Sequence, residues 1–259
     1  MKNIILAAFL YMMSMSVFAT KTINLTDDNM LVLNDAVSAE SASNLLNKAF
    51  KLSLENPHID LYLVLDSPGG DVVAGMNVIE GLNALPNKVH TITFSAASMA
   101  YQMAQNLGTR YITKYGYLMS HRAKLGGIGG QMPGELDTRL NFYKDLLGTI
   151  DVDTAKRIGI SLPEYTKLIH DEYWVIGDAA VKANHADEVV LVSCSKKLIE
   201  SRVSKSTNGF LGSYTVKWSG CPAILYPLGI KANDELGVKN MKEFRDSIIN
   251  KKTWNVKGL

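Results

Sequence analysis

Three side chains of this 259-residue chain are of the types that acyl transfer requires, although each also has an ordinary structural use. Ser98 is a candidate nucleophile that could simply cap a helix. His121 is a candidate base, but a lone histidine after an apolar strand is usually structural. Asp171 is a candidate carboxylate that could instead bond a nearby backbone amide. Acyl transfer needs a nucleophile, a base and a group that orients the base, so the combination is more informative than any member.

The chain also offers backbone groups that could stabilise a developing oxyanion. Ser98 is expected to begin a helix, so the N–H of Met99 would point towards negative charge. The turn Ser67–Gly70 contains two glycines, and a peptide carbonyl could approach their backbone closely, although this could be only a tight turn. Ser98, His121 and this turn all follow expected strands. Strand ends in an open α/β sheet meet at one edge, where ligands bind.

Short apolar runs and helical patterns alternate through the middle of the chain. Leu61–Leu65 has five consecutive apolar residues, which indicates a strand buried on both faces. The predicted strands are 30–33, 61–65, 89–94 and 117–119. The predicted helices are 38–54, 72–85 and 98–106. Strand, helix, strand, helix with short connections predicts an α/β fold with a parallel sheet.

Two further helices are expected in the second half of the chain. A long helix is predicted from about Pro133, because apolar residues recur there at intervals of three and four. Ser161 and Glu164 have capping-box spacing for a short helix that ends near His170. The apolar stripe of the long helix must lie against another surface, and it comprises Leu136, Leu140, Tyr143, Leu147 and Ile150.

Residues 1–19 are typical of a secretory signal peptide. Lys2 precedes an apolar run that ends in Val17-Phe18-Ala19, with small residues where signal peptidase accepts them. The run is short for a bilayer span of about 20 residues, and an uncleaved membrane anchor is the alternative. We therefore expect an exported, periplasmic protein. Because disulfides persist there, Cys194 and Cys221 are predicted to pair, with two buried free thiols as the alternative.

The composition excludes several classes of protein. With 47% hydrophobic and 20% charged residues the chain is not disordered, and a formal net charge of +2 gives no general argument for nucleic-acid binding. Two cysteines are too few for a zinc cluster, so we expect no metal and no cofactor. After the signal peptide and a main domain at 20–192, residues 193–259 form a basic extension. It is predicted to hold a strand at 213–218 and a polar helix near 233–249. Its charge could favour an anionic surface, or be a solvated face.

Five motifs occur in an order that resembles a known family. They are LDSPGGDVVAGM, SAASMA, LMSH, LGGIGGQ and HDEYWVIGDAAVKANHADEVV. Over about residues 22–192 the chain is similar to the Clp protease proteolytic subunit family. The resemblance implies a crotonase-like fold of stacked ββα units. It also implies a protruding handle helix that joins subunits into homo-oligomeric rings.

The same resemblance implies a role for each candidate residue. Ser98 would be the nucleophile, His121 the general base and Asp171 the residue that orients His121. The N–H groups of Gly69 and Met99 would form the oxyanion hole. The chain would then be a serine endopeptidase that hydrolyses peptides or unfolded proteins through an acyl-enzyme. We expect it to work without a cytosolic ATPase partner, because an exported protein cannot reach one.

Substrate contacts are implied in two further segments. Gly70 and the glycine-dense stretch Leu125, Gly126 and Gly127 would lie along the bound peptide backbone. After the histidine the chain has Arg122-Ala123, where the family often has Gln-Pro. This departure bears on the substrate preference rather than on the triad.

Two other functions fit the sequence. One is a non-catalytic exported scaffold or binding protein that keeps the ring. The other is an enzyme like signal peptide peptidases, which use a serine–lysine pair, with Lys114 or Lys124 as the base. Coenzyme A enzymes of the crotonase type share the fold, but they do not require serine, histidine and aspartate together. A serine-directed probe distinguishes an enzyme from a scaffold.

Overall fold

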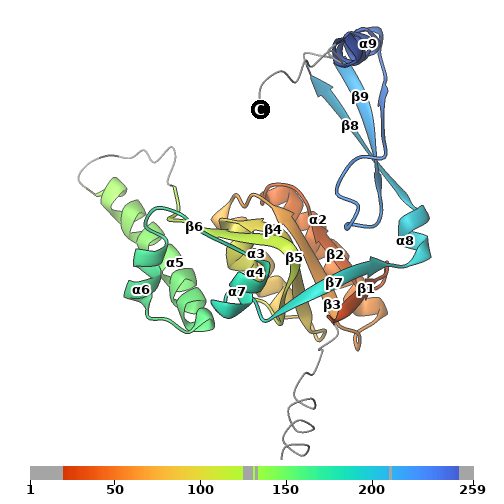
Figure 1. Cartoon of the computed structure of the whole chain (residues 1–259). Helices are drawn as coiled ribbons and strands as arrows, with labels where there is room; N and C mark the ends of the chain where they lie inside the picture. The colour runs from red at the N-terminus through yellow and green to blue at the C-terminus, as the bar shows by residue number, and fades with distance from the viewer. Residues whose placement is uncertain (1–19, 125–130, 132–133, 210–211, 251–259) are drawn as a thin grey trace, which may run out of the picture.

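The computed structural model describes residues 20–124, 131, 134–209 and 212–250. A parallel α/β body holds most of them, and a smaller antiparallel sheet projects from it (Figure 1). The expected signal peptide and the expected substrate contacts Leu125, Gly126 and Gly127 lie outside the described residues. Within the described ranges, no helix has the length and apolar character needed to cross a bilayer.

The body is built on a seven-stranded sheet with the order β1-β7-β5-β4-β3-β2, and β6 pairs with the end of β5. All pairings are parallel except that of β6 with β5. The strands are β1 (Thr22–Leu25), β2 (Met30–Leu33), β3 (Leu61–Ser67), β4 (Val89–Ala97), β5 (Arg110–Ser120), β6 (Tyr173–Ile176) and β7 (Glu188–Cys194). The predicted parallel α/β fold is confirmed.

Strand β3 shows why an unbroken apolar run was informative. It lies between β2 and β4, and Leu61, Leu63 and Leu65 on one face are completely buried. Val64, on the other face, is only 1% exposed. Both faces of the strand are therefore covered, as a run without polar alternation predicts.

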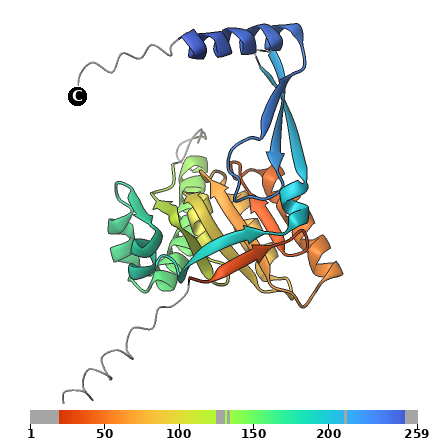
Figure 2. The same cartoon turned by 45° about the vertical axis from the view of Figure 1, so that its right-hand side comes forward.

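Helices cover one face of the sheet and extend to one side of it (Figures 1 and 2). They are α2 (Ala39–Glu55), α3 (Val72–Asn83), α4 (Met99–Gln105), α5 (Glu135–Ile158), α6 (Leu162–Leu168) and α7 (Gly177–Lys182). Ser38 and Ser161 cap α2 and α6 with capping boxes. Helix α5 begins two residues after the predicted Pro133. Of its predicted stripe, Ile150 is buried and the other four side chains are half-buried.

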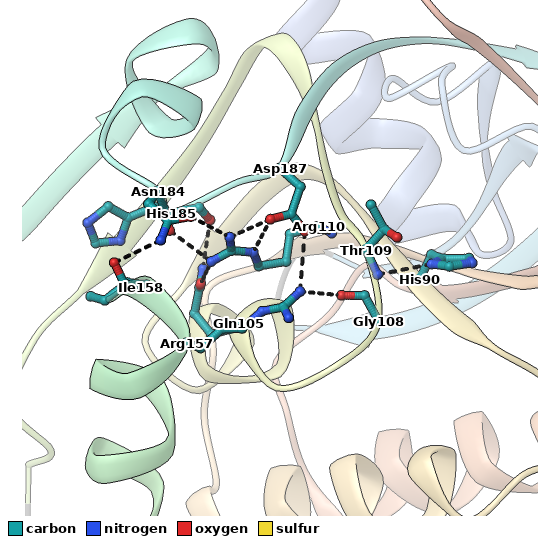
Figure 3. A network of polar contacts seen from close by, with 10 residues as sticks. All are labelled: His90, Gln105, Gly108, Thr109, Arg110, Arg157, Ile158, Asn184, His185 and Asp187. Carbon is teal, nitrogen blue, oxygen red and sulfur yellow. Dashed lines mark hydrogen bonds and ion pairs between the residues drawn. The ribbon is translucent and has the colours of Figure 1, made fainter. Parts of the chain in front are cut away.

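A buried arginine joins α7 and β7 to the body (Figure 3). Arg110, at the start of β5, donates to Asp187, to Gln105 Oε1 and to Asn184. Asn184 Nδ2 in turn donates to the carbonyl of Ile158 at the end of α5. These bonds satisfy the donors of a guanidinium that is only 4% exposed. They also fix the end of α5, a helix that lines the candidate site.

The C-terminal unit (residues 195–250) is attached at the edge of the sheet. It contains α8 (Lys196–Glu200), β8 (Arg202–Gly209), β9 (Gly212–Ser219), β10 (Gly229–Ala232) and α9 (Glu235–Asn250). Its three strands pair antiparallel in the order β10-β9-β8 and project from the body in both views (Figures 1 and 2). The strand and helix predicted here correspond to β9 and α9. The predicted pairing of Cys194 with Cys221 is confirmed, with an S–S distance of 2.04 Å.

Candidate active site

Ser98 lies at the junction of β4 and α4. Its backbone conformation is one that residues other than glycine rarely adopt. Its φ is 55° and its ψ is −120°. The N–H of Ser98 donates to the carbonyl of Met119 in β5 at 2.9 Å, and its own carbonyl accepts from Gln102 in α4 at 3.2 Å. The sheet and the helix therefore hold the residue from both sides. A positive φ in a residue other than glycine costs about 1–3 kcal/mol, and such strain concentrates at functional sites.

His121 follows the last residue of β5, and its ring contacts the serine directly. The distance between His121 Nε2 and Ser98 Oγ is 2.8 Å. Parallel pairing of β4 with β5 produces this contact, because Ala97 lies opposite Met119 in the register. Both residues therefore leave the sheet at the same edge. A neutral imidazole at this distance can accept the hydroxyl proton as the oxygen attacks a carbonyl.

Asp171 occupies a different position from its two expected partners. Its carboxylate is 96% exposed and accepts from His170 Nδ1 at 3.0 Å. In the described part of the chain, no hydrogen bond joins Asp171 to His121. The antiparallel register of β6 on β5 nevertheless places Tyr173 opposite Ser120. This last pair stands one residue before His121 and two residues after Asp171.

The glycine turn lies against the serine. A Cβ built on Gly69 would lie 2.7 Å from both Met99 N and Ser98 Cβ, and the φ of Gly69 is +87°. The N–H of Gly69 makes a long bond of 3.2 Å to Ser67 Oγ. Met99 N is the first amide of α4 and has no acceptor within the helix. The two amides predicted for the oxyanion hole are thus both next to the nucleophile.

Gly70 fixes the position of that turn. A Cβ on Gly70 would lie 2.2 Å from the carbonyl oxygen of Val37. Val37 N donates to the carbonyl of Gly69 and Val37 O accepts from Asp71 N, both at 2.9 Å. Val37 and Gly70 therefore form an isolated parallel β-bridge, which holds the turn in place.

The structure pairs the serine with a histidine and not with a lysine. No hydrogen bond between the described residues joins Lys114 or Lys124 to Ser98, and both lysines are exposed. The ammonium of Lys114 lies 5.7 Å from the centre of the Tyr115 ring. Among the described residues there is also no group of three or more side chains placed to hold a metal ion.

A cavity of about 370 Å³ adjoins the Ser98 and His121 side chains. Most of its lining comes from α4, α5 and α6. Beneath it lies a buried polar network in which Gln102 accepts from Thr154 Oγ1 and donates to Tyr165 Oη at 3.0 Å. Burial raises the pKa of Tyr165 to about 12, so its hydroxyl stays protonated.

Asp151 is the cavity residue that the sequence reasoning missed. It lines the cavity on α5, and burial raises the pKa of its carboxyl to about 6. The available signal was its position four residues after Leu147 and next to Ile150, on the apolar face of the helix. A carboxylate on an apolar helix face is unusual, and perturbed carboxyls cluster at functional sites.

The sequence matches the Clp protease family over residues 15–192. Curated relatives include ATP-dependent Clp protease proteolytic subunit 2 of Bifidobacterium longum, which is 26% identical over 171 residues. This match covers 64% of the chain and 81% of that relative. Subunit 2 of Cutibacterium acnes is 27% identical over 64% of the chain and 79% of its own length. Subunit 3 of Streptomyces coelicolor is 28% identical, with 64% and 77% covered.

Proposed function

The chain belongs to the Clp protease family, and we propose that it is a serine endopeptidase that hydrolyses peptides or unfolded proteins. The observation that carries this proposal is the 2.8 Å contact between Ser98 Oγ and His121 Nε2 at the edge of the sheet. Family membership supports a peptidase function. The strained backbone of Ser98 and the adjacent amides of Gly69 and Met99 support this residue as the nucleophile.

The proposed reaction has two halves. His121 Nε2 takes the proton of Ser98 Oγ as that oxygen attacks the peptide carbonyl, and the Gly69 and Met99 amides donate to the oxyanion. The protonated His121 then gives its proton to the leaving amine, and an acyl ester of Ser98 remains. In the second half His121 takes a proton from water, the resulting hydroxide equivalent attacks the ester, and Ser98 recovers its proton.

In this proposal Asp171 orients His121 once its side chain turns away from His170. The β5–β6 pairing ends one residue before His121 and two residues after Asp171, and the Asp171 carboxylate is exposed. A carboxylate on Nδ1 would hold the ring in the tautomer that leaves Nε2 unprotonated. We propose that contacts between subunits of a ring stabilise this rotated arrangement, with the half-buried stripe of α5 as the joining surface.

Export is part of the same proposal. The disulfide between Cys194 and Cys221 is of the kind that persists in an oxidising compartment such as the periplasm. An enzyme there would act without a cytosolic ATPase partner, on peptides or on chains that are already unfolded. Removal of residues 1–19 by signal peptidase would release it, and retention of that segment as a membrane anchor is the alternative.

Labelling by a fluorophosphonate tests the proposed catalysis. We expect the purified protein to be modified at Ser98, and Ser98→Ala to abolish both labelling and peptide hydrolysis. His121→Ala should lower hydrolysis by about 10³-fold or more, because triad members act as a unit. Full activity of His121→Ala would contradict the proposed base.

A ring-forming protein without turnover is the second candidate, because Asp171 lies away from His121. That candidate predicts that Ser98 stays unlabelled in a folded oligomer. The oligomer is established by native mass spectrometry of the same sample.

A further inference from the structure

The cavity beside Ser98 has mainly apolar walls and an acid among them. Its apolar residues are Val72, Met99, Leu147, Ile150, Leu162 and Ile169. Asp151 lines the same cavity, on the same helix as Leu147 and Ile150. Because Ser98 and His121 also line it, a side chain next to the scissile bond would enter this space.

Among the residues that the structure describes, none pairs with the carboxylate of Asp151. It makes no hydrogen bond or ion pair with any residue that the structure describes. The neighbouring amide of Gln102 is already engaged by Thr154 and Tyr165. Asp151 therefore offers this cavity a carboxylate that no described residue uses as an acceptor. A half-buried carboxylate without a partner costs free energy, and a ligand that supplies a donor recovers it.

We propose that Asp151 is a specificity-determining residue, which selects substrates with lysine or arginine immediately before the scissile bond. This inference rests on the proposed peptidase function. Both side chains combine an aliphatic stem with a cationic head, so the stem would contact Leu147 and Ile150 while the head reaches Asp151. An uncharged apolar side chain would contact the same apolar walls but leave the carboxylate of Asp151 unpaired.

Two cations line the cavity as well, but they do not neutralise Asp151. Lys144 on α5 and Arg122 after β5 are both exposed. Burial alone accounts for the raised pKa of Asp151, whereas a cation in contact would lower it. Lys144 and Arg122 are therefore solvated charges at the cavity wall, and solvent screens them more than it screens the half-buried carboxylate.

The selectivity should depend on pH. With a pKa of about 6, Asp151 is charged at pH 7.5 and neutral below pH 5. The other titratable groups that face it are His121, Lys144, Arg122 and the Tyr165 hydroxyl. The role of His121 in catalysis affects all substrates alike. A ratio of two substrates therefore removes its contribution.

The test compares pairs of peptides that differ in one charge. One peptide of each pair has arginine before the scissile bond, and the other has its uncharged isostere citrulline. The value of kcat/KM is measured for both peptides with the full chain. At pH 7.5 we expect kcat/KM to favour arginine by about tenfold or more. The ratio should fall towards one at pH 5. In Asp151→Asn it should be close to one at both pH values.

Asp153→Asn is the matched control, because it makes the same charge change on the same helix at an exposed residue that does not line this cavity. It should keep the arginine preference of the wild type. An arginine preference that survives in Asp151→Asn overturns the proposal. Preferred cleavage after glutamate also overturns it, since Lys144 and Arg122 would then dominate.

A binding measurement separates this inference from the proposed catalysis. In the Ser98→Ala variant, calorimetry compares peptides that end in arginine and in citrulline, so no turnover is needed. Tighter binding of the arginine peptide, lost in Ser98→Ala/Asp151→Asn, supports the role of Asp151 even if the wild type fails to hydrolyse any peptide. Equal binding of the two peptides overturns it, even if Ser98 reacts with a fluorophosphonate.

Discussion

At the scale of single residues, Ser98 contacts His121 in the structure, whereas Asp171 is bonded to His170. Ser98 and His121 each directly follow a strand of one parallel sheet, so their contact follows from topology. Asp171 lies in a connection before β6, and its side chain direction depends on local contacts such as the one with His170. Periodicity and spacing carry no information about such a rotation. Asp151 was missed because it belongs to none of the five motifs, and its position on the apolar face of α5 was the available signal.

The glycine turn gives the residue-scale prediction. In Gly69→Ala the new methyl group would lie 2.4 Å from the carbonyl of Ala97 and 2.7 Å from Met99 N, at a φ of +87°. The turn would have to move, and one oxyanion donor would move with it. We expect fluorophosphonate labelling of Ser98 to slow by about 100-fold, the typical cost of one such donor.

Gly229→Ala serves as the control, because a Cβ at Gly229 meets nothing within 4 Å. Its labelling rate should equal that of the wild type. Thermal unfolding of both variants shows whether the Gly69 change also unfolds the protein. Wild-type labelling by folded Gly69→Ala would exclude Gly69 from the oxyanion hole.

At the scale of elements, most strands and helices of the body could be predicted, but the contacts that join them could not. Capping boxes and apolar runs are local, so Ser38, Ser161 and Leu61–Leu65 indicated their elements directly. Strand β8 is rich in polar residues and has no apolar face, which explains why the sequence did not predict it. The bond between Arg110 and Asp187 spans 77 positions and follows only from the pairing of β5 with β7.

The arginine network gives the element-scale prediction. Arg110→Lys keeps the charge but loses the planar fork that reaches Asp187, Gln105 and Asn184 together. Buried partners would stay unsatisfied, so we expect the free energy of unfolding to fall by about 3 kcal/mol. The measurement is equilibrium unfolding in urea at pH 7.5.

Arg157→Lys is the comparison variant at the same network. Its side chain is 39% exposed and also contacts Asp187, at 3.2 Å. Solvent replaces much of that bond, so a loss of about 0–1 kcal/mol is expected. Equal losses in the two variants would show that burial of Arg110 has no special importance for stability.

At the scale of the whole molecule, the C-terminal unit projects from the body and also contributes buried residues to its core. A second core lies on the face of the sheet opposite α2, α3 and α4. Leu198 and Cys221 of the unit are buried there, together with Val64 and Ile92 of the sheet. Charge and composition marked these residues as a basic extension. They could not show that its base packs on the sheet, because that packing is a long-range contact.

The disulfide gives the whole-molecule prediction. Cys194 ends β7 and Cys221 lies just after β9, so their bond closes a loop with a sequence separation of 27. Opening this loop raises the entropy of the unfolded chain and should cost about 3.5 kcal/mol of stability. No described residue of the C-terminal unit lines the cavity beside Ser98. In Cys194→Ser/Cys221→Ser we therefore expect faster trypsin cleavage between residues 196 and 217 but an unchanged rate of Ser98 labelling.

The control is the wild type without reductant, and wild type treated with reductant should match the double variant. Loss of labelling together with faster cleavage would instead show that the second core supports the catalytic edge.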